Sequence, residues 1–492
     1  MALLPLALAA GGGRIGAAGA GVVFEAQQLV AAGITLLQRS APLVRALSGR
    51  RGAILLPTSP AFITALAACD GRGAVLINPL AAPAEIAFQC TDANVGAVFT
   101  TRAFVPRLPH GITTVLLDDA PRRATVLAAG RTHDVDLGTH HGLLLEGERD
   151  VDGRDEEAAI VYTSAMQGTP LGAILTHRNL LANARSTIEA LDDTADDHVL
   201  ALLPFAHLFG LTVTATAPLL LGARVTTVER FNPLKAVDLL TDGVTQVAGV
   251  PAVFHALLSV IARRGVSLRD SALRLCLCGG AVLPVELQDR WADVTGMELR
   301  QGYGLTEGSP VCLVNRPDQP NARGTMGTAM PRVDVRIFSP ADYGAPHEGQ
   351  HAHTEARADT IADGTPGEIC IRGTNVFRGY VGDRQGLPRR GDWLCTGDEG
   401  VRDANGNVTF LGLLKPMFTR SGFNVYPREL EQAVAAMPGV TCAQVSALPD
   451  PVKENDILLR VTGSVLEDDV KRWCDQHLSA YKQPSVIEIL PA

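Results

Sequence analysis

The chain has no basic run, no internal repeat and no apolar stretch long enough to cross a membrane. Its 43 Lys and Arg residues are outnumbered by 52 Asp and Glu residues, which leaves a formal net charge of −9 over 492 residues. A protein of this charge without a basic patch does not attract a polyanion. We therefore exclude nucleic acid as a partner.

Metal-binding patterns are also missing. The nine cysteines are scattered and odd in number, and only Cys276 and Cys278 stand close together. Because zinc-type and disulfide-type spacings are lacking, we expect a reduced protein in the cytoplasm. Residues 340–366 contain histidines that could bind metal, but no Cys or carboxylate spacing supports a site, and we expect an exposed loop. These histidines are His347, His351 and His353.

The first ten residues are almost wholly apolar, as in the core of a signal peptide. No basic residue precedes them, however, and Pro5 interrupts them. The Gly-rich stretch 11–21 carries Arg14 and cannot extend a membrane span. We expect a frayed N-terminal lead-in rather than a secretion signal or a transmembrane segment.

Hydrophobic residues make up 46% and charged residues 19% of the chain, a composition that is typical of a soluble globular enzyme. Apolar runs of strand length alternate with amphipathic stretches. Residues 52–56 are followed by a helical pattern at 59–68, and residues 246–250 are also followed by a helical pattern. This alternation predicts parallel sheets covered by helices.

The pattern changes after Gly412, where short strands accompany two predicted helices at 427–436 and 467–478. A chain of this length exceeds one ordinary core, so two lobes are expected. We predict an α/β fold with a large N-terminal lobe of parallel or mixed sheets flanked by helices, residues 1–411. A small α+β C-terminal lobe follows at residues 412–492.

The most informative segment spans residues 159–180. An apolar run ends in Tyr162-Thr163-Ser164, a loop with hydroxyls, Gly168 and a proline follows, and a second apolar run comes next. The backbone N–H groups and hydroxyls of such a loop can converge on phosphate oxygens. The segment resembles the phosphate-binding loop of the acyl-adenylate-forming superfamily, which includes acyl-CoA synthetases, nonribosomal peptide adenylation domains and luciferases. The resemblance makes Thr163, Ser164 and Gly168 candidate nucleotide-binding residues.

Six further segments resemble motifs of that superfamily and stand in its order. The most specific is Gln-Gly-Tyr-Gly-Leu-Thr-Glu at residues 301–307. The resemblance implies that Tyr303 lies on adenine, that Thr306 binds phosphate, and that Glu307 binds Mg²⁺ through a hard carboxylate oxygen. Thr306 and Glu307 are therefore also candidate catalytic residues.

Two segments resemble parts of the superfamily that border the substrates. Residues 203–210 imply that His207 borders an acyl pocket and takes part in catalysis, although a lone histidine there would be an ordinary core residue. Residues 279–284 begin with a glycine pair after a predicted strand. The resemblance places a purine against Gly280 and Ala281, whereas the pair alone indicates only a tight turn.

Three later segments complete the resemblance. Thr-Gly-Asp at 396–398 implies that Asp398 accepts both ribose hydroxyls. Gly-Glu-Ile-Cys-Ile-Arg-Gly at 367–373 resembles a motif of the superfamily that is chiefly structural. Residues 421–431 closely resemble a phrase of fatty acyl-CoA ligases. Arg420 matches the basic residue that precedes this phrase, which makes it a candidate cofactor-binding residue.

The chain departs from the superfamily at several of these motifs. Leu171 replaces a lysine of the phosphate loop. A charge-assisted contact is worth about 1.5–3 kcal/mol, so its loss costs roughly ten- to over a hundredfold in that interaction. Leu413 replaces an arginine that helps hold the ribose, and Pro416 stands at the hinge aspartate, so we expect the hinge near 415–416. The other substitutions are Ala165 for glycine, Met166 for serine or threonine, and Gln167 for threonine.

The end of the chain resembles the segment that precedes the superfamily's catalytic lysine. That lysine would lie a few residues beyond Ala492, whereas Lys482 matches a structural Tyr-Lys-x-Pro. Two interpretations stay open. Either the chain stops short of its natural end, or adenylation is slow, borrowed or lost.

The resemblance implies an acid–thiol ligase that uses ATP, Mg²⁺ and CoA to convert a carboxylic acid through acyl-AMP into a thioester. The phrases at 302–310 and 421–426 look most like medium- and long-chain fatty acyl-CoA ligases, so we favour a fatty acid. Two alternatives stay open. One is a catalytically impaired pseudo-ligase that binds nucleotide or acyl-adenylate as a scaffold or partner, and the other is a ligase that passes the acyl group to an acyl carrier protein.

Overall fold

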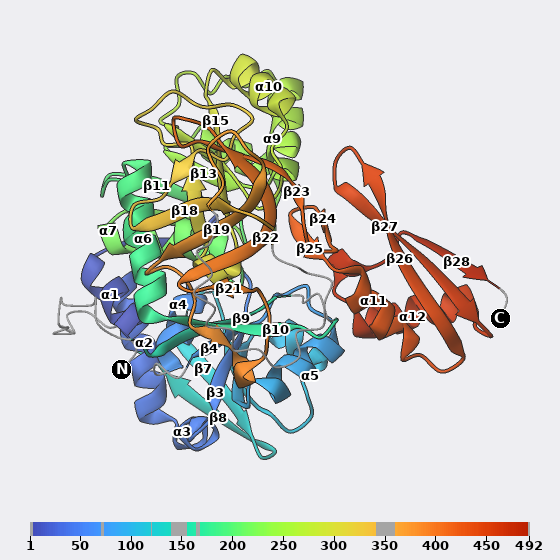
Figure 1. Cartoon of the computed structure of the whole chain (residues 1–492). Helices are drawn as coiled ribbons and strands as arrows, with labels where there is room; N and C mark the ends of the chain where they lie inside the picture. The colour runs from blue at the N-terminus through green and yellow to red at the C-terminus, as the bar shows by residue number, and fades with distance from the viewer. Residues whose placement is uncertain are drawn as a thin grey trace.

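The computed structural model describes residues 3–69, 73–119, 121–138, 155–163, 168–340 and 360–490. Figure 1 shows a large lobe coloured from blue to orange and a smaller red lobe beside it, which holds the C-terminus. Two nine-stranded sheets and a smaller third sheet build the large lobe. The arrangement confirms the predicted α/β class with sheets flanked by helices.

The first large sheet has the strand order β17-β16-β15-β14-β13-β11-β12-β1-β2. Its strands from β1 through β15 are parallel neighbours, and they are apolar on both faces because helices cover both sides. On one face α8 (Pro233–Leu240), α9 (Pro251–Arg264) and α10 (Val285–Thr295) share an apolar core with the sheet. The strands are β1 (Arg14–Ala17), β2 (Val23–Glu25), β11 (His198–Ala201), β12 (Arg224–Thr227), β13 (Gln246–Gly249), β14 (Leu275–Cys278), β15 (Leu299–Gly304), β16 (Val311–Val314) and β17 (Thr328–Ala329).

The second large sheet has the order β20-β10-β9-β4-β3-β5-β6-β7-β8. The predicted strand at 52–56 is β3, and the predicted helix after it is α4 (Ala61–Ala68), so this part of the alternation is confirmed. The strands are β3 (Arg51–Leu55), β4 (Ala74–Leu76), β5 (Val95–Thr100), β6 (Thr113–Leu117), β7 (Arg123–Ala128), β8 (Arg131–Asp136), β9 (Glu157–Thr163), β10 (Leu171–Thr176) and β20 (Gly379–Tyr380).

One apolar core contains residues of both large sheets and of the helices packed with them. All eight residues of α4 are buried in it. Helix α2 (Ala26–Arg39) crosses α4 at Gly33, where an added Cβ would lie 2.4 Å from the carbonyl oxygen of Thr64. A side chain at this position would force the two helices apart. The other helical segments of the lobe are α3 (Ala41–Leu47), α5 (Pro83–Asp92), α6 (His177–Leu191), α7 (Ala217–Leu221), η1 (Arg102–Arg107), the π-helix η2 (Phe209–Thr216), η3 (Thr306–Gly308) and η4 (Val381–Asp383).

The N-terminal segment is an ordered part of this core, so the expectation of a frayed lead-in was wrong. It forms α1 (Leu3–Gly11), which packs on α2, α6 and α7. Leu4 and Leu8 are buried, and the Leu4 N–H donates to His177 Nδ1 at 3.1 Å. Apolar residues four apart on one helix face find a partner surface here. None of the helices in the described ranges is long and apolar enough to cross a membrane.

The third sheet and the small lobe follow in sequence. Strands β18 (Val333–Phe338), β19 (Gly367–Gly373), β21 (Arg389–Arg390), β22 (Trp393–Arg402) and β23 (Val408–Leu413) form the third sheet. The small lobe contains the hairpin β24 (Phe418–Arg420) with β25 (Phe423–Val425), the sheet β26 (Val440–Asp450), β27 (Glu454–Gly463) and β28 (Val486–Leu490), and the helical segments α11 (Pro427–Ala435), α12 (Glu467–His477) and η5 (Ala480–Lys482). Helices α11 and α12 match the two helices predicted for this lobe at 427–436 and 467–478.

The connection between the lobes is short. Strand β23 ends at Leu413 and β24 begins at Phe418, so we keep the hinge near 415–416 as a proposal. Residues 341–359 lie outside the described residues, and with them the predicted loop histidines His347, His351 and His353.

Candidate active site

A cavity of about 2790 Å³ lies between the two lobes. Its walls include the carboxyl ends of the parallel strands β14 and β15, the end of β9, part of β22 and the hairpin β24–β25. Parallel α/β sheets bind ligands at the carboxyl ends of their strands. Most of the predicted site residues line this cavity: Thr163, Gly168, His207, Gly280, Ala281, Tyr303, Thr306, Glu307 and Asp398.

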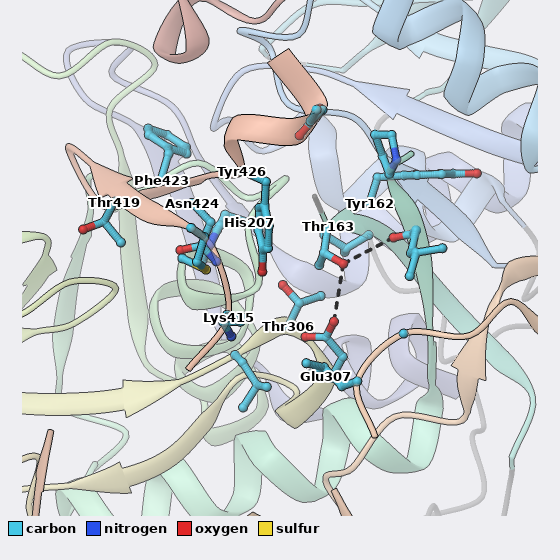
Figure 2. Close-up of a pocket in the computed structure, with 18 of the residues that line it drawn as sticks. Tyr162, Thr163, His207, Thr306, Glu307, Lys415, Thr419, Phe423, Asn424 and Tyr426 are labelled. Atoms are coloured by element: carbon cyan, nitrogen blue, oxygen red, sulfur yellow. Dashed lines mark hydrogen bonds between the residues drawn. The ribbon is translucent and has the colours of Figure 1, made fainter. Parts of the chain in front are cut away.

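Glu307 is a buried carboxylate that receives hydroxyl donors from two other segments. The Tyr380 hydroxyl donates to Glu307 Oε1 at 2.8 Å, and the Thr163 hydroxyl lies 3.4 Å from the same oxygen (Figure 2). Burial and the nearby charge of Glu307 raise the pKa of Tyr380 far above its usual value, so this phenol stays a donor. A buried carboxylate among oxygen groups fits the ligand preference of Mg²⁺. Glu307 would hold that ion.

Asp398 is the second buried carboxylate of the cavity, and both of its oxygens have a partner. The Tyr303 hydroxyl donates to Asp398 Oδ2 at 2.6 Å, and the ammonium nitrogen of Lys415 lies 3.2 Å from Oδ1. Burial and the charge of Asp398 raise the pKa of Tyr303, so Tyr303 also remains protonated. The two residues predicted to hold adenine and ribose are therefore joined directly.

His207 lies in the loop before the π-helix η2. Its Nδ1 accepts the backbone N–H of Phe209 at 3.2 Å, and burial lowers its pKa. The ring is therefore neutral near pH 7, and its proton sits on Nε2. A neutral N–H donor on the cavity wall can orient a carbonyl or carboxylate oxygen of a substrate.

The small lobe covers the predicted purine site. Gly280 has a φ of +79°, a left-handed conformation that suits the tight turn after β14. A Cβ at Gly280 would lie 3.9 Å from the carbonyl oxygen of Gly422, and one at Gly422 would lie 2.7 Å from Val250. The hairpin β24–β25 thus rests against the turn. Figure 2 shows its residues Thr419, Phe423 and Asn424 at the cavity, together with Tyr426.

Two predicted residues are not placed in the cavity. Ser164 lies outside the described residues. Arg420 does not line the cavity in the lobe arrangement seen here, and its role as a cofactor-binding residue stays a prediction. Its guanidinium pairs with Asp456 at 2.5 Å and donates to the carbonyl oxygens of Tyr481 and Gln483, all within the small lobe.

Two other cavity residues were not recognised from the sequence. Tyr380 was given no role, because a Gly-Tyr pair such as 379–380 carries no chemical signal by itself. Lys415 was covered only by the expected hinge at 415–416, because a lone lysine in the bend after a strand carries no sequence signal for its contact with Asp398.

The family profile described as AMP-binding enzyme matches residues 43–381. The chain belongs to the AMP-binding enzyme family. A feruloyl-CoA synthase from Amycolatopsis sp is 31% identical over 456 residues, which cover 89% of this chain and 84% of that protein. A long-chain-fatty-acid–CoA ligase from Bacillus subtilis is 26% identical over 475 residues, covering 89% and 82%.

Solved structures share the fold of this AMP-binding enzyme. A malonyl-CoA ligase in a ternary product complex with methylmalonyl-CoA and AMP has a TM-score of 0.78 at 24% identity, covering 98% of this chain and 97% of its own. An o-succinylbenzoate CoA synthetase from Bacillus subtilis has a TM-score of 0.77 at 22% identity, covering 100% and 95%. Both likenesses confirm the large α/β lobe with a small C-terminal lobe.

This AMP-binding enzyme carries apolar side chains at two positions where the motif resemblance predicts a cation. Leu171 begins β10, is buried in the large core and lines the cavity. Leu413 is the strand partner of Asp398 in the pairing of β22 with β23. The charge that lies beside Asp398 therefore comes from Lys415.

Proposed function

We propose that this protein is an ATP-dependent acid–CoA ligase. The observation that carries the proposal is the joining of Tyr303 to Asp398, with Thr306 and Glu307 in the same cavity. A nucleotide bound there would place its ribose at Asp398 and its phosphates toward Thr306 and Glu307. Relatives named as CoA ligases, at 26–31% identity, support the assignment.

The reaction would proceed in two steps. In the first, a carboxylate oxygen attacks the α-phosphorus of ATP, an acyl–phosphate bond forms, and pyrophosphate leaves. In the second, a thiol attacks the acyl carbon, the acyl–phosphate bond breaks, and AMP leaves with the electron pair. Mg²⁺ bound at Glu307 would offset phosphate charge. The residues of the chain would align the carboxylate with the α-phosphate, and alignment supplies a large part of such a rate enhancement.

The acid is proposed to be a monocarboxylate with an apolar body. Part of the cavity wall is apolar and is formed by Phe209, Leu277, Leu305 and Val311. A fatty acid is our first candidate for this body, on the motif phrases that resemble fatty acyl-CoA ligases. An aryl-substituted propenoic acid is the second, because relatives are named feruloyl-CoA synthase and 4-coumarate–CoA ligase.

The two steps are expected to differ in efficiency. Leu171 supplies no charge to the β- and γ-phosphates, which only ATP carries. The hairpin β24–β25 of the small lobe lies over the cavity, which suits a step in which a thiol meets a bound acyl-adenylate. We therefore propose that synthetic acyl-AMP with CoA gives thioester faster than free acid with ATP.

The test is an assay of acid-dependent pyrophosphate release and thioester formation across straight-chain acids and aryl propenoic acids. CoA and a phosphopantetheinylated carrier protein are offered in turn as acceptors. Release with CoA as the preferred acceptor supports the ligase, and a preference for the carrier supports a carrier-protein ligase. A third outcome is that AMP stabilises the protein thermally while no product forms, either from any acid with ATP or from acyl-AMP with CoA. This outcome contradicts the ligase and favours the pseudo-ligase.

A further inference from the structure

Lys415 places a buried ammonium on the nucleotide side of the cavity. Its Nζ donates to the carbonyl oxygen of Thr396 at 2.8 Å and lies 3.2 Å from Asp398 Oδ1. An ammonium has three N–H donors. Of these two contacts with described residues, only the bond to Thr396 is a hydrogen bond, whereas the contact with Asp398 Oδ1 is an ion pair, so an N–H and the positive charge remain available to a ligand in the cavity, which Lys415 lines.

The position of Lys415 follows from the strand pairing. Asp398 and Leu413 are direct partners of β22 and β23, and the Leu414 N–H donates to the carbonyl oxygen of Gly397 at 2.9 Å. The chain bends at residues 414–416 directly after β23, and from this bend Lys415 Nζ reaches Asp398, the strand partner of Leu413. The long lysine supplies there the charge that Leu413 cannot supply.

The surroundings keep this side chain charged. Burial opposes the charge, but the carboxylates of Asp398 and Glu307 outweigh it and raise the pKa of Lys415 above its usual value. Figure 2 shows Lys415 to the left of Thr306 and Glu307. The ammonium thus contacts the predicted ribose ligand Asp398 and lies near enough to Glu307 for the two charges to interact.

We propose that Lys415 is a nucleotide-binding residue that donates its free N–H and its charge to the α-phosphate of AMP and acyl-AMP. The proposal rests on the proposed nucleotide function of the cavity. A charge-assisted hydrogen bond to this phosphate would hold AMP in the lobe arrangement seen here and stabilise it as the leaving group of thioester formation. A cation for the α-phosphate would thereby be supplied from the connection between the lobes.

The test is calorimetric titration of the whole protein with AMP and with adenosine, which lacks the phosphate. Lys415→Met removes the charge at similar length, and Lys415→Arg keeps it. Lys471→Met is the matched control, because Lys471 is an exposed lysine of α12 that pairs with Glu467. We expect Lys415→Met to weaken AMP binding by about ten- to a hundredfold and adenosine binding by less than about threefold. Lys415→Arg should stay within about threefold for both ligands.

A second variant guards against a folding defect. Leu413→Arg added to Lys415→Met returns a cation beside Asp398 on the ribose side, so it should keep adenosine binding within about threefold of wild type while AMP binding stays weakened. Unchanged AMP affinity in Lys415→Met, or an equal loss for AMP and adenosine, would overturn the phosphate role. Wild-type protein that binds neither AMP nor acyl-AMP would instead refute the proposed function itself.

Discussion

Lys482 connects the two lobes through two buried carboxylates. Its Nζ lies 2.9 Å from Glu85 Oε1 in α5 and 2.5 Å from Glu429 Oε1 in α11. All three side chains are at most 12% exposed. Glu85 also accepts the Ser479 hydroxyl and the backbone N–H of Ala82. One ammonium therefore neutralises a carboxylate from each lobe at the docking surface.

Lys482→Met should release the small lobe from the large one. Removing one partner of a buried ion pair costs about 3–5 kcal/mol, because the remaining charge is left without compensation. Here two carboxylates would face each other, so the docked arrangement loses at least that much unless one of them takes up a proton. An effect of this size raises the undocked fraction by about a hundred- to a few thousandfold.

Limited proteolysis of the connection between β23 and β24 measures this equilibrium, because cleavage follows the open population when opening is fast. Lys471→Met is again the control, since its exposed pair with Glu467 is worth about 0.5 kcal/mol or less. Adding Glu85→Gln to Lys482→Met should restore part of the protection. Cleavage of Lys482→Met at the wild-type rate would refute the reasoning.

The pH dependence gives a second measurement of the same contact. Burial opposes the charge of Lys482, but Tyr481 and both carboxylates outweigh it and raise its pKa well above the usual value. A raised lysine pKa contributes stability that is fully present below about pH 10.4 and is lost as the pH rises through the folded-state pKa. Wild-type docking should therefore weaken only in strong alkali, and Lys482→Met should lack this transition.

Three further outcomes are expected. Asp398→Ala should weaken AMP binding by about 1.5–3 kcal/mol in calorimetry, whereas Glu307→Ala should weaken Mg²⁺–ATP and leave AMP nearly unchanged. Among the nine cysteines only Cys442 is exposed, so a thiol reagent should label one thiol rapidly in native protein and the other eight on unfolding. Burial opposes the charge of Asp197, but hydrogen bonds from Arg274, Thr245 and Thr194 outweigh it and lower the pKa of Asp197 to about 2. The ionised Asp197 therefore stabilises the fold above about pH 4, and this stabilisation is lost as the pH falls from about 4 to about 2. Asp197→Asn should flatten acid unfolding in that range, as followed by circular dichroism.

The order of strands and helices could be predicted because buried parallel strands are continuous apolar runs. The strands at 52–56 and 246–250 could be predicted from their apolar composition and from the helical pattern that follows each of them. The N-terminal helix could not be predicted in the same way. Its apolar face gains stability from α2, α4, α6 and α7, and contacts with residues far along the chain leave no trace in a local pattern.

The site could be predicted where one motif carries several functional residues. Tyr303, Thr306 and Glu307 stand in a single short phrase, and the structure places all three in the cavity. Contacts between distant strands could not be predicted. Cys370 and Cys395 are 25 residues apart, yet pairing of β19 with β22 brings their sulfur atoms to 3.4 Å. Arg420 is the opposite case. It matches a motif, but its guanidinium is bound within the small lobe and does not line the cavity.

Leu413 and Pro416, two residues that depart from the superfamily motif, flank Lys415 in the connection between the lobes. Leu413 leaves Asp398 without a cation from β23, and Pro416 restricts φ near about −65° one residue after Lys415. If the proposed hinge near 415–416 operates, rotation of the small lobe would use the residues around the proline and would move the Lys415 ammonium relative to Asp398. A nucleotide held by Lys415 would bind best in the arrangement that keeps the two together, so its binding would favour that arrangement. Because the favoured arrangement also requires Lys482 to meet Glu85, nucleotide affinity and lobe docking should change together when either lysine is replaced.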